Sequence, residues 1–154
     1  MIRLNTGLLL AALAAATFVL PALADNHQKT ADSQAPSAKA LVILSDSSVQ
    51  TQGMAMVLGN TMSDQGAEVH VLLCDQAGDL ALKSYQGVAL KPKDLTPGQM
   101  LRRLIKEGAT VKVCALYLPN STHSQADLLE GVSVATPPEM AAQMLDPAFR
   151  IFSF

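Results

Sequence analysis

The apolar run Ala40-Leu41-Val42-Ile43-Leu44, followed by the polar turn Ser45-Asp46-Ser47-Ser48, decides the fold class of this chain. An apolar run without alternating polar residues is typical of a strand that is buried on both faces, as in a parallel sheet. Further strands are expected at 69–73, 111–116, 132–135 and 149–154. Because helical stretches separate these strands and no hairpin signal is present, the sequence predicts a doubly wound α/β sheet with helices on both faces.

Helix signals lie between the predicted strands. The segment Thr96-Pro97-Gly98-Gln99 predicts a helix start with a Thr cap, Pro at the first helical position and Gln completing a capping box. The segment Thr136-Pro137-Pro138-Glu139 repeats this pattern, and residues 126–130 predict a short helix. Another helix is indicated by four apolar residues at helical spacing, which are Met54, Val57, Leu58 and Met62.

Length, charge and cysteine content narrow the classes of function. The chain has 154 residues, of which 49% are hydrophobic and 16% are charged, as expected of one ordinary folded domain. Eleven Lys and Arg residues against thirteen Asp and Glu residues give a net charge of -2, so there is no basic field to hold nucleic acid. Two cysteines are too few for a zinc site with four Cys ligands or for a scaffold of several disulfides.

Residues 1–24 have the pattern of an export signal. Arg3 is the only charged residue among them, an apolar core covers 8–20, and an A-x-A motif ends at Ala24. The alternative is an uncleaved membrane anchor, but the apolar core is shorter than the ~20 residues that a spanning helix needs, and Pro21 interrupts it. We therefore expect a cleaved signal peptide, a periplasmic mature protein and no stable membrane anchor after cleavage.

The residues behind this signal, 25–38, carry no large apolar side chain, and we expect a flexible leader ahead of a folded domain at 39–154. Cleavage after residue 24 would give the N-terminus Asp25-Asn26-His27. A free amine, two amide nitrogens and an imidazole at the third position can hold Cu(II) or Ni(II) in a square plane. The alternative is that His27 stands in a solvated tail and binds nothing.

Both cysteines fall at the carboxyl ends of predicted strands, which is the edge of an open α/β sheet where ligands gather. Cys74 ends the second strand and Cys114 ends the third. A reactive cysteine needs nearby positive potential, because the thiolate is the nucleophile. Lys112 lies on the strand face of Cys114, and His123 follows in the next loop, so both are candidate stabilisers of a thiolate. The alternative is that Cys114 is a buried small hydrophobe, as free cysteines usually are.

Cys74 has three interpretations. It is a packing residue, a resolving partner of Cys114, or one half of a disulfide with Cys114, which an oxidising compartment would permit. Adjacent parallel strands place Cα atoms about 5 Å apart, which is compatible with a disulfide. No cofactor is indicated, because the sequence has neither G-x-G-x-x-G after its first strand nor G-x-x-x-x-G-K-[ST] anywhere.

The order of three segments resembles the DsrE/DsrF-like sulfur-relay family. The match spans residues 39–154, and its pieces are TQGMAMVLGNTMSDQGAEVHVLL (51–73), EGATVKVCALYL (107–118) and ADLLEGVSVATPPEMAAQML (126–145). The resemblance implies a five-stranded parallel sheet in a three-layer sandwich, assembled as trimers or hexamers. In members that relay sulfur, a cysteine in the position of Cys114 carries sulfur as a persulfide between partner proteins.

Two function classes follow from the residues and the resemblance together. The first is a periplasmic sulfur-relay or sulfurtransferase-like protein that carries sulfane sulfur on Cys114 and exchanges it with a donor or acceptor protein. The second is a non-catalytic periplasmic binding or assembly module with structural cysteines that hold a thiol-loving metal. The first class predicts uptake of sulfur on Cys114, and the second predicts inert thiols.

Overall fold

The structure is a computed structural model, and it describes residues 37–154. The predicted signal peptide (1–24), most of the predicted leader and the candidate copper or nickel site at Asp25, Asn26 and His27 lie outside the described residues. Within 37–154, no helix has the length and apolar character needed to cross a bilayer.

Five parallel strands form one sheet in the order β4-β3-β2-β1-β5. Each strand lies where an apolar run predicts it, and the strands are β1 (Lys39–Leu44), β2 (Glu68–Leu73), β3 (Thr110–Val113), β4 (Val132–Val134) and β5 (Phe149–Ser153). β1 lies inside the sheet, between β2 and β5, and none of its residues is exposed, as expected for the unbroken apolar run that begins at Ala40.

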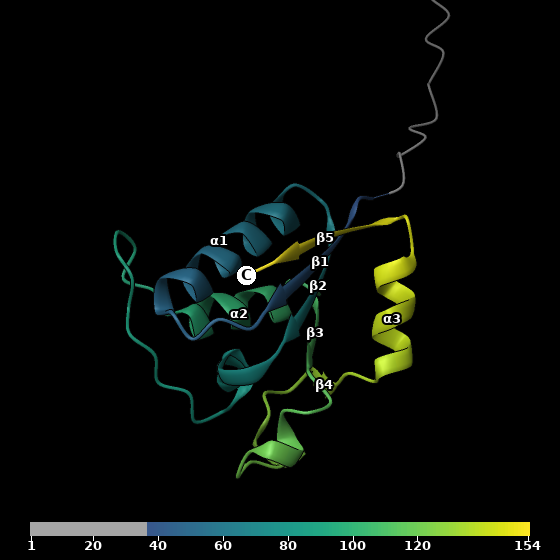
Figure 1. The fold of residues 1–154 in the computed structure, drawn as a ribbon. Coiled ribbons are helices and arrows are strands. Elements are labelled where there is room, and N and C mark those ends of the chain that lie inside the picture. The colour runs from purple at the N-terminus through teal and green to yellow at the C-terminus, as the bar shows by residue number, and fades with distance from the viewer. Residues whose placement is uncertain (1–36) are drawn as a thin grey trace, which may run out of the picture. The chain divides into compact units, whose positions relative to one another are not determined.

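Helices cover both faces of the sheet. In Figure 1, α1 (Val49–Asp64) and α2 (Pro97–Lys106) lie on one face, and α3 (Pro137–Leu145) lies on the other. Short 3-10 helices occupy the connections, namely η1 (Asp75–Ala81), η2 (Leu118–Asn120) and η3 (Gln125–Asp127). The predicted doubly wound, three-layer α/β sandwich with a five-stranded parallel sheet is therefore confirmed.

One of the two predicted capping boxes forms. At α2, the Thr96 hydroxyl accepts from the Gln99 amide at 3.1 Å, and the Gln99 side chain accepts from the Thr96 amide at 2.8 Å. At α3, Thr136 makes no side-chain cap bond. The box predicted there is therefore wrong in its Thr136 half, whereas the Glu139 carboxylate bonds the Thr136 backbone and also binds Lys112 on β3.

The helix predicted at 126–130 is also wrong, since only the short η3 forms there. The backbone of this segment pairs with the chain that follows η1. Leu128 forms an isolated bridge with Leu82, and the Leu129 amide donates to the Ala81 carbonyl at 2.8 Å. These bonds pull the segment into an extended conformation and stop the helix after one turn.

The helix predicted around Met54 is confirmed as α1, but of the four apolar residues that indicate it only Met62 packs against the core. Met54, Val57 and Leu58 are 55%, 47% and 41% exposed. The buried face consists of small and polar residues, which are Gln52, Gly53, Ala55, Met56, Gly59 and Asn60. At Gly59 a Cβ atom would lie 3.1 Å from a methyl carbon of Leu104, so this face packs closely against α2.

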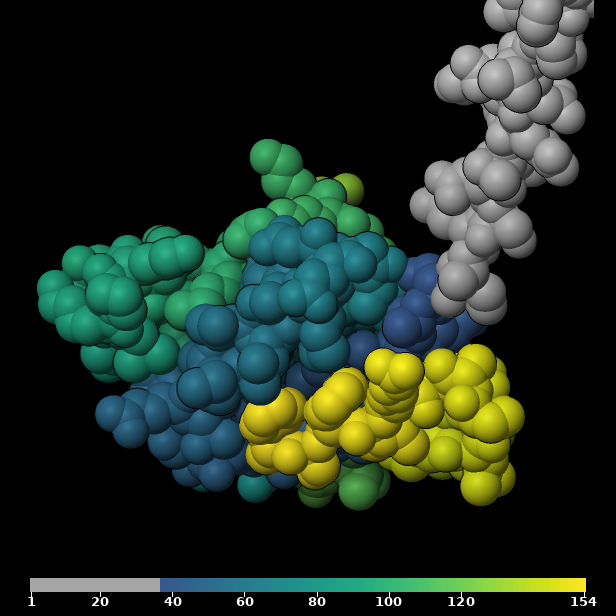
Figure 2. All heavy atoms as spheres, turned by 90° about the horizontal axis from the view of Figure 1, so that it is seen from above, coloured from purple at the N-terminus to yellow at the C-terminus, as the bar shows by residue number. Residues whose placement is uncertain are grey.

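Residues 83–95 form the arm that extends beyond α1 at the left of Figure 1 and the lobe at the left of Figure 2. Leu90 and Leu95 form an isolated bridge in this arm. The arm and α1 enclose a groove of about 860 Å³, and Met54 and Val57 are among the apolar side chains that line it. The outward apolar face of α1 therefore borders this groove instead of the main core.

The core has two parts, one on each face of the sheet. The larger part lies under α1 and α2. The smaller part lies under α3 and consists of Leu41, Leu72, Ala135 and Met140. Cys74 and Cys114 pack against this smaller cluster, so both thiols are on the α3 face.

Candidate functional site

Main-chain hydrogen bonds hold Cys74 and Cys114 side by side. Leu73 on β2 is the register partner of Val113 on β3, so the residues that follow them are neighbours. The Cys114 amide donates to the Leu73 carbonyl at 2.8 Å, and the Cys74 amide donates to the Leu44 carbonyl at 2.8 Å. The parallel pairing therefore continues one residue past each strand and places both cysteines at the carboxyl edge of the sheet, where the sequence predicts them.

The two thiols are free and partly exposed, and their side chains are within hydrogen-bonding reach of each other. Burial raises the pKa of the Cys74 thiol to about 12, with further contributions from Cys114 and from the Asp75 carboxylate. Cys74 is thus protonated at neutral pH, and its S–H group can donate a hydrogen bond to the sulfur of Cys114.

Both cysteines open into a cavity of about 460 Å³, a size suited to a small molecule. The loops after β2 and β3 supply its walls, which are formed by Cys74, Asp75, Gln76, Asp79, Cys114, Leu116, Tyr117, Asn120 and Ser121. None of these lining residues is Lys, Arg or His. The cavity therefore surrounds the thiols with carboxylates, amides, the hydroxyl groups of Tyr117 and Ser121, and the aliphatic side chain of Leu116, which is 70% exposed.

Tyr117 forms a fixed wall of the cavity. Its hydroxyl donates to Asp79 Oδ1 at 2.6 Å. Its ring covers Gly78, where a Cβ atom would lie 2.4 Å from two ring carbons. Burial and the contact with Asp79 raise the pKa of Tyr117, so it stays a neutral donor. The sequence analysis missed Tyr117 and Asp79 as site residues, and the available signal was their position in the loops that directly follow the cysteines.

Lys112 shares the sheet face of Cys114, as predicted, but its ammonium group binds Glu139 on α3. This contact lowers the pKa of the Glu139 carboxyl. The positive charge of Lys112 is therefore compensated by Glu139. His123 is not among the residues that line the cavity, although its amide donates to the hydroxyl of the lining residue Ser121 at 3.2 Å.

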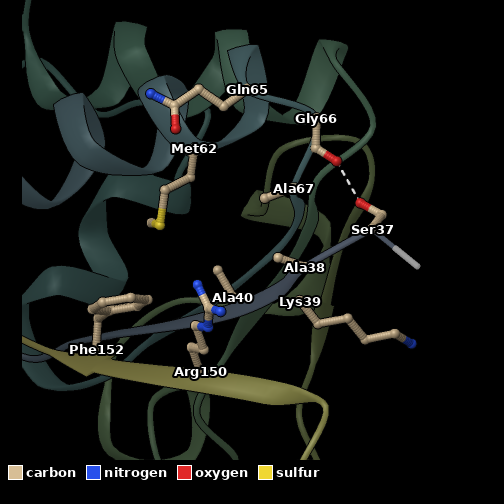
Figure 3. Close-up of a pocket in the computed structure, with 10 residues that line it drawn as sticks. All are labelled: Ser37, Ala38, Lys39, Ala40, Met62, Gln65, Gly66, Ala67, Arg150 and Phe152. Carbon is tan, nitrogen blue, oxygen red and sulfur yellow. Dashed lines mark hydrogen bonds between the residues drawn. The ribbon is translucent and has the colours of Figure 1, made fainter. Parts of the chain in front are cut away.

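A separate cavity of about 420 Å³ lies at the opposite end of the strands from the cysteines, near the start of β1 (Figure 3). Met62, Arg150 and Phe152 contribute to its walls, and the Ser37 hydroxyl donates to the Gly66 carbonyl at its rim. Neither cysteine lines this cavity. It lies at the amino ends of the strands, whereas α/β sheets place ligands and chemistry at the carboxyl ends.

The reactive groups at the carboxyl ends of the strands are the two thiols of Cys74 and Cys114. Among residues 37–154, no three or more side chains of His, Cys, Asp or Glu are grouped so that they could hold a metal ion. A thiol beside a second, protonated thiol is suited to sulfur transfer and to thiol–disulfide exchange.

Comparison with known proteins supports the architecture. No protein-family model matches the chain, and no curated protein matches its sequence. Among solved structures, the ychN protein from E. coli matches with a TM-score of 0.55 and 19% identity, covering 75% of this chain and 98% of that one. The chain shares the fold of the ychN protein.

A second solved structure has the same architecture. The protein of unknown function MTH1491 from Methanobacterium thermoautotrophicum matches with a TM-score of 0.62 and 13% identity, covering 77% of this chain and 100% of that one. These similarities confirm the fold that the resemblance to the DsrE/DsrF-like family implies. The sulfur chemistry of the cysteines stays a prediction, because a fold does not fix a reaction.

Proposed function

We propose that this protein is a periplasmic sulfur carrier that holds sulfane sulfur as a persulfide on Cys114. The observation that carries the proposal is the pair of free thiols at the cavity, of which Cys74 is held protonated. The Cys114 thiolate attacks the outer sulfur of a donor persulfide R–S–SH. Cys114–S–SH forms, and the donor leaves as the thiolate R–S⁻.

The assignment of Cys114 as the acceptor follows from the surroundings of Cys74. Burial and Asp75 disfavour a thiolate at Cys74, and a protonated thiol is a poor nucleophile. The S–H group of Cys74 can instead stabilise negative charge on the sulfur of Cys114. Cys74 takes the stabilising role that the sequence analysis assigned to Lys112 and His123, since Lys112 is engaged by Glu139.

The export signal predicted at 1–24 supports a periplasmic location, where a donor or acceptor protein would meet the open cavity. We also propose a homo-oligomer, for which the resemblance to the DsrE/DsrF-like family implies a trimer or hexamer. Exposed apolar side chains on α1 and the arm support this assembly, among them Met54, Val57 and Val88. Light scattering on the folded protein measures the number of subunits directly.

A sulfur-loading experiment tests the proposed function. Reduced protein is incubated with a sulfane-sulfur donor, the excess donor is removed, and non-reducing peptide masses are measured. Cys74→Ser should gain one sulfur atom on the peptide that contains Cys114, and so should the wild type when it is measured immediately after loading, whereas Cys114→Ser should not. An adduct that survives in Cys114→Ser, or thiols that stay unmodified in every variant, would refute the carrier and favour the scaffold alternative.

A further inference from the structure

We propose that Cys74 discharges the Cys114 persulfide, releasing the carried sulfur as hydrosulfide and leaving a Cys74–Cys114 disulfide. This inference rests on the proposed function, because it needs a persulfide at Cys114. It adds a reductive activity to the carrier, since sulfane sulfur enters the site and sulfide leaves it.

The geometry of the pair supports this reaction. Residues opposite each other on parallel strands have Cα atoms about 5 Å apart, within the range of roughly 4.4–6.8 Å that disulfides span. Cys74 has extended backbone angles (φ -120°, ψ 160°), so the strand geometry persists at the cysteine itself. Both side chains pack against the same cluster under α3, so they leave the sheet on one face. A bond between the two sulfurs therefore requires no shift of register.

The electrons and protons of the step balance within the pair. As its proton passes to the outer sulfur of Cys114–S–S⁻, Cys74 becomes the thiolate that attacks the inner sulfur and forms the disulfide bond. The bond between the two persulfide sulfurs breaks, and its electron pair leaves on the outer sulfur. That sulfur carries the proton from Cys74 and departs as HS⁻. The thiol pair is oxidised, the sulfane sulfur is reduced to sulfide, and an external dithiol must reduce the disulfide before the next cycle.

The resting site is arranged for this proton transfer. The Cys74 thiol interacts with the Cys114 side chain, and the sulfur that must leave is bonded directly to the Cys114 sulfur. The leaving anion enters a cavity whose lining carries Asp75 and Asp79 and none of the cationic residue types. These carboxylates repel HS⁻ and favour its departure.

Sulfide release from the loaded protein tests the inference. The loaded wild type should release one sulfide per chain and form the Cys74–Cys114 disulfide, as read from non-reducing peptide masses. Cys74→Ser should keep its persulfide and release sulfide slower by roughly two orders of magnitude, because an intramolecular thiol acts at a high effective concentration. Glu107→Gln at the end of α2 is the control, since Glu107 does not line the cavity, and the variant keeps both thiols and should behave as the wild type.

The outcomes separate this inference from the proposed function. If Cys114 loads but Cys74→Ser releases sulfide at the wild-type rate, the discharge step is overturned and the carrier stands. If Cys114 does not load, both fail together. A third arm tests the geometry without any sulfur donor: diamide should oxidise the reduced, folded wild type to an intramolecular Cys74–Cys114 disulfide. Failure to form that disulfide while the protein stays folded would overturn the inference.

Discussion

Alkylation of Cys74 should be strongly suppressed in the folded protein. At pH 8 a thiol with an ordinary pKa of about 8.5 is roughly one quarter thiolate, and iodoacetamide reacts with the thiolate. A thiol whose pKa is about 12, as at Cys74, is ionised to roughly one part in ten thousand at that pH. We therefore expect Cys74 to be alkylated about a thousandfold more slowly in the folded chain than in the denatured chain.

The assay is labelling with iodoacetamide over a series of pH values, read by peptide mass. Labelling of Cys74 should rise about tenfold per pH unit, up to a pH near the raised pKa. Cys114→Ser should keep most of the suppression, because burial is the largest cause of the shift. Since the pKa is raised on folding, the associated stability is present below pH 9.0 and is lost as the pH rises toward 12. Equal labelling of folded and denatured Cys74 at pH 8 would refute this reasoning.

Two further predictions concern the walls of the site. Gly78→Ala should displace the ring of Tyr117 and destabilise the fold by about 1–3 kcal/mol in urea denaturation, whereas unchanged stability would contradict the close contact at Gly78. Lys112→Met should let the pKa of Glu139 return toward its usual 4.5. Because that pKa is lowered on folding, its stabilising effect is present above about pH 4.5 and lost in acid. The Tm of Lys112→Met should therefore fall less steeply than that of the wild type as the pH is lowered below about 4.5. Identical profiles of Tm against pH in the wild type and the variant would contradict the ion pair.

The sequence predicts the layered architecture because that architecture depends on local pattern. The apolar run at Ala40 and the capping box at Thr96 need no partner to be recognised, and both are present in the structure. The buried face of α1 depends on close contact with α2, which the spacing of Met54 and its apolar neighbours does not reveal. The capping pattern at Thr136 forms only in part, because the Thr136 hydroxyl makes no cap bond while the Glu139 carboxylate also binds Lys112 from a distant strand.

The candidate site, like the fold, is predictable from the sequence only where it depends on local pattern. Parallel strands end at one edge, so the positions of Cys74 and Cys114 already indicate that they share it. Their direct adjacency also depends on β2 and β3 being neighbours in matching register. The bond between Tyr117 and Asp79 joins two irregular loops, for which the sequence has no periodic signal. Sequence reasoning thus finds the reactive atoms more readily than the groups that shape their surroundings.

The most direct test of the sulfur chemistry at Cys114 is the non-reducing intact mass of the wild type immediately after exposure to a sulfane donor. Two species should appear over time: first a chain heavier by one sulfur atom, then a chain lighter than the reduced protein by two hydrogen atoms as the disulfide closes. A single, unchanged mass in a folded protein whose thiols began reduced would contradict it.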